Sequence, residues 1–159
     1  DGMLRDARRA LGARDSRFSF AAFDCEKIPA ASESYDLVIA NHVLFYCDNL
    51  ENVCREVRRI LKPDGRFLCS TYGNSHMKEI SQLVSQFDER IVLSANKLYE
   101  KFGRENGAQV LEPWFSRVEW ISYEDGLLVS DPEPLISYIL SCHGKGCLCI
   151  DRIIILCRR

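Results

Sequence analysis

Apolar and polar positions alternate most informatively between residues 34 and 67. Leu37–Ala40 is a short apolar run, typical of a strand that is covered on both faces. After a polar Asn-His pair, apolar residues recur at helical spacing and form one stripe: Leu50, Val53, Cys54, Val57, Ile60 and Leu61. The opposite face is charged, and we expect solvent to cover it: Glu51, Arg55, Arg58, Arg59 and Lys62.

The ends of this helix are also marked in the sequence. Asp48 is the expected N-cap, with Glu51 three residues later as its capping-box partner. Pro63-Asp64-Gly65 is expected to end the helix and turn the chain into a strand at Phe67–Thr71. Strand, helix and strand together predict a parallel α/β unit, with Asn41 and His42 at the carboxyl end of its first strand. In open α/β sheets, ligands bind at that end.

The remaining pattern predicts further strands and helices around this unit. A helix over Met3–Leu11 is stopped by Gly12, and a strand follows at Arg17–Phe23. Three helices are expected at His76–Phe87, Ser94–Phe102 and Ala108–Glu112, and a fourth begins at Asp131-Pro132. Strands are expected at Val118–Tyr123, Leu127–Val129 and Cys149–Cys157. Strands that alternate with crossovers predict a doubly wound α/β sheet, and one of the last strands is expected to run antiparallel.

Composition fits a single domain over residues 1–159 and narrows the possible partners. The net charge is −2 and no block of like charge stands out, so the sequence does not favour a nucleic-acid partner. No apolar run approaches the roughly 20 residues that span a bilayer. The N-terminal stretch is charged and lacks a signal-peptide core, so we expect a cytoplasmic protein with reduced thiols.

The eight cysteines fall into two groups. Four are single residues in apolar or helical contexts and are expected in the core: Cys25, Cys47, Cys54 and Cys69. The others lie in a C-H-x3-C-x-C cluster formed by Cys142, His143, Cys147 and Cys149. That cluster is open to a zinc interpretation, but its spacing fits no common zinc pattern. We therefore expect a loop followed by a strand there, and no metal.

Several segments together resemble the class I S-adenosylmethionine-dependent methyltransferases. The most specific are SYDLVIANHVLFY and EVRRILKPDGRFLCSTYG, supported by GMLRDARRAL and FDCEKIP. The sequence is most similar to the branch that includes quinone-biosynthesis and other small-molecule methyltransferases. The resemblance implies a Rossmann-like sheet, S-adenosylmethionine as cofactor and a small-molecule methyl acceptor.

The resemblance also implies a cofactor role for five residues. Asp24, after the family's third strand, would accept a hydrogen bond from the adenine amino group, and the Cys25 backbone N–H would bind the adenine ring. A carboxylate beside a backbone N–H complements the donor and acceptor edge of adenine. Asn41 and His42 would lie beside the methionine part, and Met3 near the adenine. The alternative for Asp24 and His42 is a merely polar residue at the end of a strand or the start of a helix.

Three further residues would line the acceptor pocket. Tyr46, Tyr72 and His76 follow the tips of the predicted strands. The alternative is that the tyrosines are half-buried packing residues and that His76 is an exposed residue at a helix start. Methyl transfer from a sulfonium is a direct displacement, so the enzyme mainly has to align donor and acceptor and exclude water. Neither a nucleophilic residue nor a metal is required.

One defining part of the family is missing from this sequence. The glycine-rich loop after the first strand, and the acidic residue that binds the ribose, do not occur, so the chain lacks strands 1 and 2. We therefore expect methyl transfer by the full-length protein, with weak or absent cofactor binding and no activity by this chain alone. The alternative is a non-catalytic remnant or a binding or oligomerisation module with the same fold. A nucleic-acid methyltransferase is disfavoured, since Asn41-His42-Val43-Leu44 replaces the Asn/Asp-Pro-Pro-aromatic stretch of those enzymes.

Loss of strands 1 and 2 would expose one edge of the Leu37–Ala40 strand. An apolar free edge is prone to pair with another strand. We therefore expect that the Arg17–Phe23 strand docks on that edge, or that a second copy of the chain covers it in a homodimer.

Overall fold

The computed structural model describes residues 2–12, 15–90, 97–123, 126, 128–142 and 154–157. The chain forms two compact units. The first unit is made of Asp1–Val43, Cys47–Cys69 and Asp151–Arg159, and the second of Leu44–Tyr46 and Ser70–Ile150. That all 159 residues form a single partial methyltransferase domain stays a prediction.

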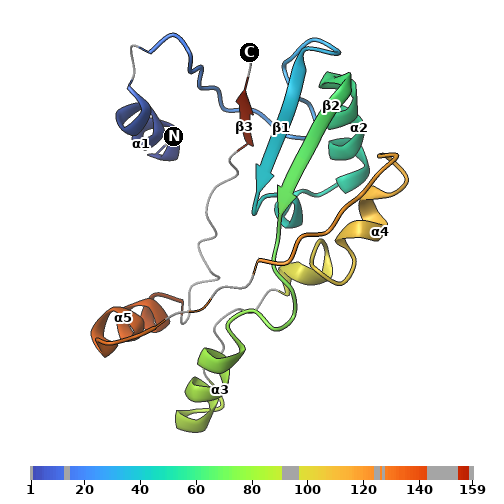
Figure 1. Cartoon of the computed structure of the whole chain (residues 1–159). Coiled ribbons are helices and arrows are strands. Elements are labelled where there is room, and N and C mark those ends of the chain that lie inside the picture. The colour runs from blue at the N-terminus through green and yellow to red at the C-terminus, as the bar shows by residue number, and fades with distance from the viewer. Residues whose placement is uncertain are drawn as a thin grey trace. The chain divides into compact units, whose positions relative to one another are not determined.

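A three-stranded sheet organises the first unit. Its strands are β1 (Tyr35–Asn41), β2 (Leu61–Ser70) and β3 (Ile154–Cys157), in the order β2-β1-β3. β1 and β2 run parallel, and β3 runs antiparallel to β1 (Figure 1). The expected mixed sheet with an antiparallel strand is therefore confirmed. The described strands form a partial version of a Rossmann-like α/β fold.

The edge of β1 that faces away from β2 pairs with β3, a pairing that was not predicted from the sequence. β3 forms the ladder with β1, and the register joins Leu37 with Cys157 and Ala40 with Ile154. The prediction that Arg17–Phe23 docks on this edge is wrong, because β3 supplies the missing hydrogen-bond partners. A second copy of the chain is not needed to cover this part of β1, so the physical reason for a homodimer falls away.

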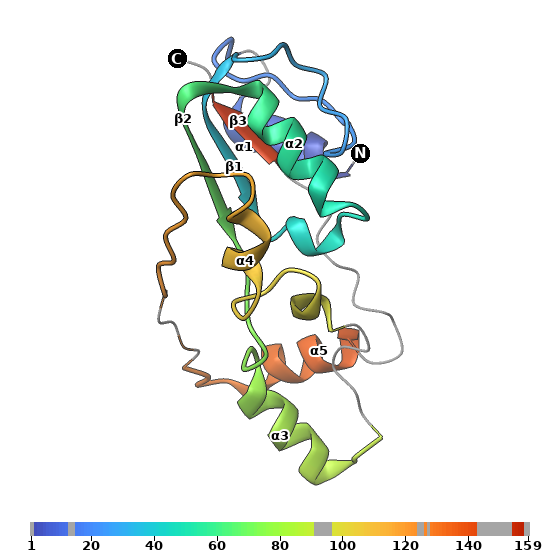
Figure 2. The same ribbon diagram turned by 90° about the vertical axis from the view of Figure 1, so that its right-hand side faces the viewer.

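β1 has one fully buried face rather than two. Val38 and Ala40 are buried, whereas Leu37 and Ile39 on the other face are half-buried. The helix α2 (Leu50–Ile60) lies along the sheet and contributes Val53, Cys54, Val57 and Ile60 to the buried core (Figure 2). Burial of each such large apolar side chain contributes roughly 1.5–3 kcal/mol. The predicted apolar stripe is confirmed, with Leu50 half-buried.

The start of α2 differs by one residue from the prediction. Asn49, not Asp48, is the N-cap: it has an extended backbone, and its side chain accepts a hydrogen bond from Asn52 N at 3.0 Å. Glu51 lies in the first turn and Arg58 in the last, where each charge favours the helix dipole. The helix ends at Ile60, and Pro63-Asp64-Gly65 lies inside β2 rather than in a separate turn.

Two of the predicted strands are wrong. The described residues of Arg17–Phe23 and Val118–Tyr123 belong to no strand. Alternating apolar residues create a strand only where a neighbouring backbone completes the ladder. Residues 128 and 129 are not in a strand either, and residue 127 lies outside the described part of the chain. Of the predicted strand at Cys149–Cys157, residues 154–157 form β3 and the rest lies outside the described residues.

Most of the predicted helices are present. α1 spans Gly2–Leu11, and Gly12 follows with a φ of 85°, which is the left-handed conformation that glycine adopts at helix ends. The second unit contains a 3-10 helix η1 (Leu44–Tyr46), α3 (Lys78–Phe87), a 3-10 helix η2 (Leu98–Glu100), α4 (Gly107–Leu111) and α5 (Pro132–Cys142). Only η2 represents the predicted Ser94–Phe102 helix, since residues 94–96 lie outside the described part. Asp131 caps α5 as predicted, accepting a hydrogen bond from Glu133 N at 3.1 Å.

Within the described residues, no helix is long and apolar enough to cross a membrane. Those residues also hold no group of His, Cys, Asp and Glu that could bind a metal ion. Most of the cluster considered for zinc, from His143 to Cys149, lies outside them.

The cap of α2 can be tested by mutation. Asn49→Ala removes the acceptor for Asn52 N and should lower the free energy of unfolding by about 1 kcal/mol. Asn49→Asp keeps a side-chain oxygen at the cap and should stay within about 0.5 kcal/mol of the wild type. Urea denaturation followed by circular dichroism measures both. Equal losses in the two variants would contradict the assignment of the cap to Asn49.

Candidate functional site

One group of candidate residues lies in and around a turn that precedes β1, in the first unit. Asp24 and Cys25 begin this turn, which is closed by a hydrogen bond from Lys27 N to Asp24 O at 3.0 Å. The Asp24 side chain accepts a hydrogen bond from Glu26 N at 2.9 Å and is exposed to solvent. Cys25 is buried, with an exposed fraction of 2%. The backbone therefore holds one carboxylate oxygen of Asp24, while the side chain stays exposed to solvent.

Side chains around α2 hold this turn and the segment after it in place. Ile28 N donates to the carboxylate of Glu56 at 2.9 Å, and Asn49 N donates to that of Glu26 at 2.8 Å. The guanidinium of Arg59 donates to Ile28 O at 2.9 Å and to Ala30 O at 2.7 Å. Backbone groups without a helical or strand partner are thus satisfied.

Arg59 and Glu56 also bind each other through hydrogen bonds of 2.8 and 2.7 Å. Hydrogen bonds from Arg59 are the main reason why the pKa of Glu56 lies below its usual value. The prediction that Arg59 is a solvated surface residue is wrong, because its planar fork serves two backbone carbonyls as well as a carboxylate. Sequence spacing could not show this, since Arg59 and Ile28 are 31 residues apart.

Asn41 and His42 lie where the sequence predicted, at the carboxyl end of β1. Asn41 is the last residue of the strand, and both side chains are exposed. His42 has a φ of 49°, a left-handed conformation that is uncommon for residues other than glycine. Such backbone positions occur often at functional sites. Met3 lies half-buried in α1, and Arg8 of that helix contacts the Phe20 backbone and ring.

A separate group of candidate residues forms an aromatic cluster in the second unit. The rings of Tyr72 and His76 lie 4.6 Å apart between their centroids. Phe45 lies edge-on to Tyr46 at 4.6 Å and to Tyr72 at 5.2 Å, and Tyr99 lies 6.4 Å from Tyr72. The structure therefore brings together all three residues predicted for the acceptor pocket. Two further members of the cluster were not predicted from the sequence: Phe45, which is buried, and Tyr99, which lies in η2.

Hydrogen bonds clamp the segment after β2 that carries Tyr72. Thr71 Oγ1 donates to Phe102 O at 2.7 Å, and Arg104 N donates to Tyr72 O at 3.2 Å. Asn74 N donates to the carboxylate of Glu105 at 3.1 Å. Residues 71–74 are therefore fixed against residues 102–105, which holds the tyrosine ring in the cluster.

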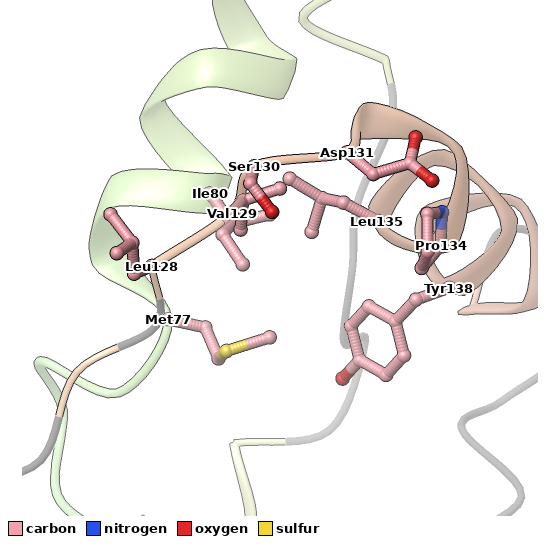
Figure 3. Close-up of a pocket in the computed structure, with 9 residues that line it drawn as sticks. All are labelled: Met77, Ile80, Leu128, Val129, Ser130, Asp131, Pro134, Leu135 and Tyr138. Atoms are coloured by element: carbon pink, nitrogen blue, oxygen red, sulfur yellow. The ribbon is translucent and has the colours of Figure 1, made fainter.

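An apolar pocket begins one residue after His76. It has a volume of about 390 Å³ and lies between α3 and the segment that leads into α5 (Figure 3). In Figure 3 the side chains of Met77 and Tyr138 point toward one another, whereas the carboxylate of Asp131 is turned away. The volume is within the range of small-molecule sites. The second unit thus offers a small molecule both aromatic and apolar surface.

The comparisons with known proteins agree with the motifs found in the sequence. Residues 1–69 match the family described as a methyltransferase domain. The match includes the Asp24 turn, β1, α2 and all but the last residue of β2. It thus covers the five residues for which the sequence resemblance implies cofactor contacts.

Curated relatives are methyltransferases as well. The chain is 34% identical over 99 residues to a malonyl-[acyl-carrier protein] O-methyltransferase of Methylovorus sp., covering 58% of this chain and 33% of that protein. It is 27% identical over 123 residues to the corresponding protein of Chlorobium luteolum, covering 77% of this chain and 42% of the relative. It is 38% identical over 52 residues to a sterol 4-C-methyltransferase of Caenorhabditis elegans, covering 33% of the chain and 16% of the relative. The matched part of this chain therefore spans less than half the length of each of these relatives.

Removal of the Arg59 side chain tests how the Asp24 turn is held. Arg59→Ala leaves two backbone carbonyls and the Glu56 carboxylate without their donor, and should lower the free energy of unfolding by about 2 kcal/mol. Arg55→Ala is the matched control: Arg55 pairs with Glu51 on the exposed face of the same helix, so its loss should be below about 0.5 kcal/mol. Urea denaturation measures both values. Similar losses would show that Arg59 is an ordinary surface residue.

Gly103 tests the packing behind the aromatic cluster. A Cβ at this position would overlap the backbone oxygen of Tyr99, so Gly103→Ala must push η2 away. We expect a loss of about 1–3 kcal/mol in the free energy of unfolding. Gly126→Ala is the control, since a Cβ there has no atom within 4 Å. Thermal unfolding followed by tyrosine fluorescence compares the two, and an unchanged Gly103→Ala variant would contradict the close contact.

Proposed function

We propose that this chain is part of an S-adenosylmethionine-dependent methyltransferase that transfers a methyl group to a small molecule. The observation that carries the proposal is the match of residues 1–69 to the methyltransferase domain family together with the geometry of the Asp24 turn. The family uses S-adenosylmethionine as methyl donor. The turn presents an accessible carboxylate next to a backbone segment, as adenine recognition requires.

In this proposal, the residues of the first unit bind the cofactor. Asp24 accepts a hydrogen bond from the adenine amino group, and the Cys25 N–H contacts the ring. Asn41 and His42 border the methionine part at the end of β1, and Met3 lies near the adenine. S-adenosylmethionine supplies an activated methyl group. The residues of the chain therefore only need to bind, orient and exclude water.

The acceptor contacts the aromatic cluster of Tyr46, Tyr72 and His76. Aromatic side chains offer a large apolar surface with a polar tip, which suits an organic acceptor with few charges. The names of the relatives include both an acyl-carrier-protein substrate and a sterol, so they do not fix the acceptor. A nucleic acid is not part of the proposal, because the net charge is −2. A homodimer is not part of it either, because β3 pairs with β1.

Activity belongs to the full-length protein in this proposal. The 159 residues lack the family's glycine-rich loop, which contacts the ribose and methionine, so this chain alone should bind the cofactor weakly. Titration calorimetry with S-adenosylmethionine compares this chain with the full-length gene product. Tight binding by the full-length protein supports the proposal, and absence of binding favours the alternative of a non-catalytic protein with the same fold.

Mutation of Asp24 tests the adenine contact directly. Asp24→Asn keeps one oxygen for Glu26 N but replaces the other with an amide donor, which faces the adenine amino donor. We expect the affinity of the full-length protein for S-adenosylmethionine to fall about tenfold or more. Asp64→Asn makes the same chemical change at an exposed position in β2 and should leave the affinity unchanged. Equal affinities of the two variants would remove Asp24 from the cofactor site.

A further inference from the structure

Two buried cysteines meet behind the Asp24 turn. Cys25 belongs to the turn and Cys47 lies 22 residues further along, directly after η1. Their Sγ atoms are 3.2 Å apart, and the exposed fractions of the two residues are 2% and 0%. Neither cysteine is in a disulfide in this structure. The fold therefore brings into contact two thiols that no sequence pattern pairs.

The hydrogen bonds of the pair indicate how the thiols are oriented. Cys47 Sγ donates to Val43 O at 3.7 Å, so its single hydrogen is directed away from Cys25. The Cys25 thiol can then donate to Cys47 Sγ, whose lone pairs face it. A disulfide requires a sulfur separation of about 2.05 Å. The sulfurs in this structure are therefore about 1.15 Å further apart than in a disulfide.

Cys54 and Cys69 are two other cysteines of the first unit. Burial raises the pKa of the Cys54 thiol to about 11, and burial together with Cys54 raises that of Cys69 to about 11. A thiol with such a pKa is almost entirely protonated near neutral pH and is a poor nucleophile. Cys54 is therefore a suitable control residue on α2, close in sequence to Cys47.

We propose that Cys25 and Cys47 are a modification site that forms a reversible disulfide by exchange with an oxidised low-molecular-weight thiol such as glutathione disulfide. Asp24 and Lys27 near Cys25 are exposed, and local opening of this turn would expose the Cys25 sulfur. Its thiolate attacks the small disulfide, forms a mixed disulfide and releases one small thiolate. The Cys47 thiolate then attacks the Cys25 sulfur and releases the second.

The exchange balances without a further reactant. The two protein thiols lose two protons and two electrons, and the small disulfide takes up both to become two thiols. The new bond would close a loop between residues 25 and 47 that contains all of β1. It would restrict the Asp24 turn, which carries the residues proposed for adenine binding. Formation of the disulfide itself does not depend on the proposed function.

Mass spectrometry of the oxidised chain tests the pair. The 159-residue protein is incubated with millimolar glutathione disulfide, remaining thiols are blocked with N-ethylmaleimide, and the protein is digested with trypsin. We expect a disulfide between the peptide of residues 18–27, which holds Cys25, and that of residues 28–55, which holds both Cys47 and Cys54. The link should persist in Cys54→Ala and disappear in Cys25→Ala and Cys47→Ala.

Unfolding provides a second readout. The oxidised wild type should have a higher midpoint of thermal unfolding than the reduced protein, by about 5 °C or more, because the cross-link restricts the unfolded chain. Cys25→Ala should show no such shift on treatment with glutathione disulfide. Blocked Cys25 in the oxidised wild type, a product that stops at the mixed disulfide, or a link that is lost in Cys54→Ala would each overturn the proposal.

Discussion

The first unit depends on α2 to satisfy the backbone of the irregular segment that leads from the Asp24 turn to β1. Residues 26–34 have neither a helical nor a ladder partner, and an unpaired buried backbone group is costly. α2 supplies partners from its side chains at Glu56 and Arg59 and from its last carbonyls, which accept from Glu33 N at 2.9 Å and Ser34 N at 2.8 Å. The same helix packs its apolar face into the core. One helix thus fixes both the strand and the turn that precedes it.

In the second unit, hydrogen bonds likewise hold an irregular segment in place, namely the segment that follows β2. The chain leaves β2 without regular structure, yet Tyr72 and His76 must keep a defined position if they are to contact a ligand. Backbone and side-chain hydrogen bonds between residues 71–74 and 102–105 provide that position. Close contact at Gly103 then lets η2 bring Tyr99 near the same rings. A small number of directed bonds therefore replaces the ladder of a sheet.

Much of the fold followed from periodicity and from residue chemistry. The stripe from Val53 to Leu61 predicted α2, and the apolar run Leu37–Ala40 predicted β1, because both patterns depend on local spacing alone. Capping and helix-ending residues were almost as informative, with Gly12 and Asp131 predicted correctly and the α2 cap displaced by one residue. Tyr46, Tyr72 and His76 were selected because they follow the tips of strands, and their role in binding an acceptor stays a prediction.

The sequence by itself determined the α/β character, the helix faces and the similarity to methyltransferases, since these rest on neighbouring residues and motifs. Only the tertiary structure decided which strand lies beside β1, what Arg59 binds and that Cys25 meets Cys47. Each of these depends on residues 22 or more positions apart, and no local pattern encodes such a pairing. The apolar segment at Arg17–Phe23 was predicted as a strand from its composition but does not form one. A strand-like composition forms a strand only where a neighbouring backbone completes its hydrogen bonds.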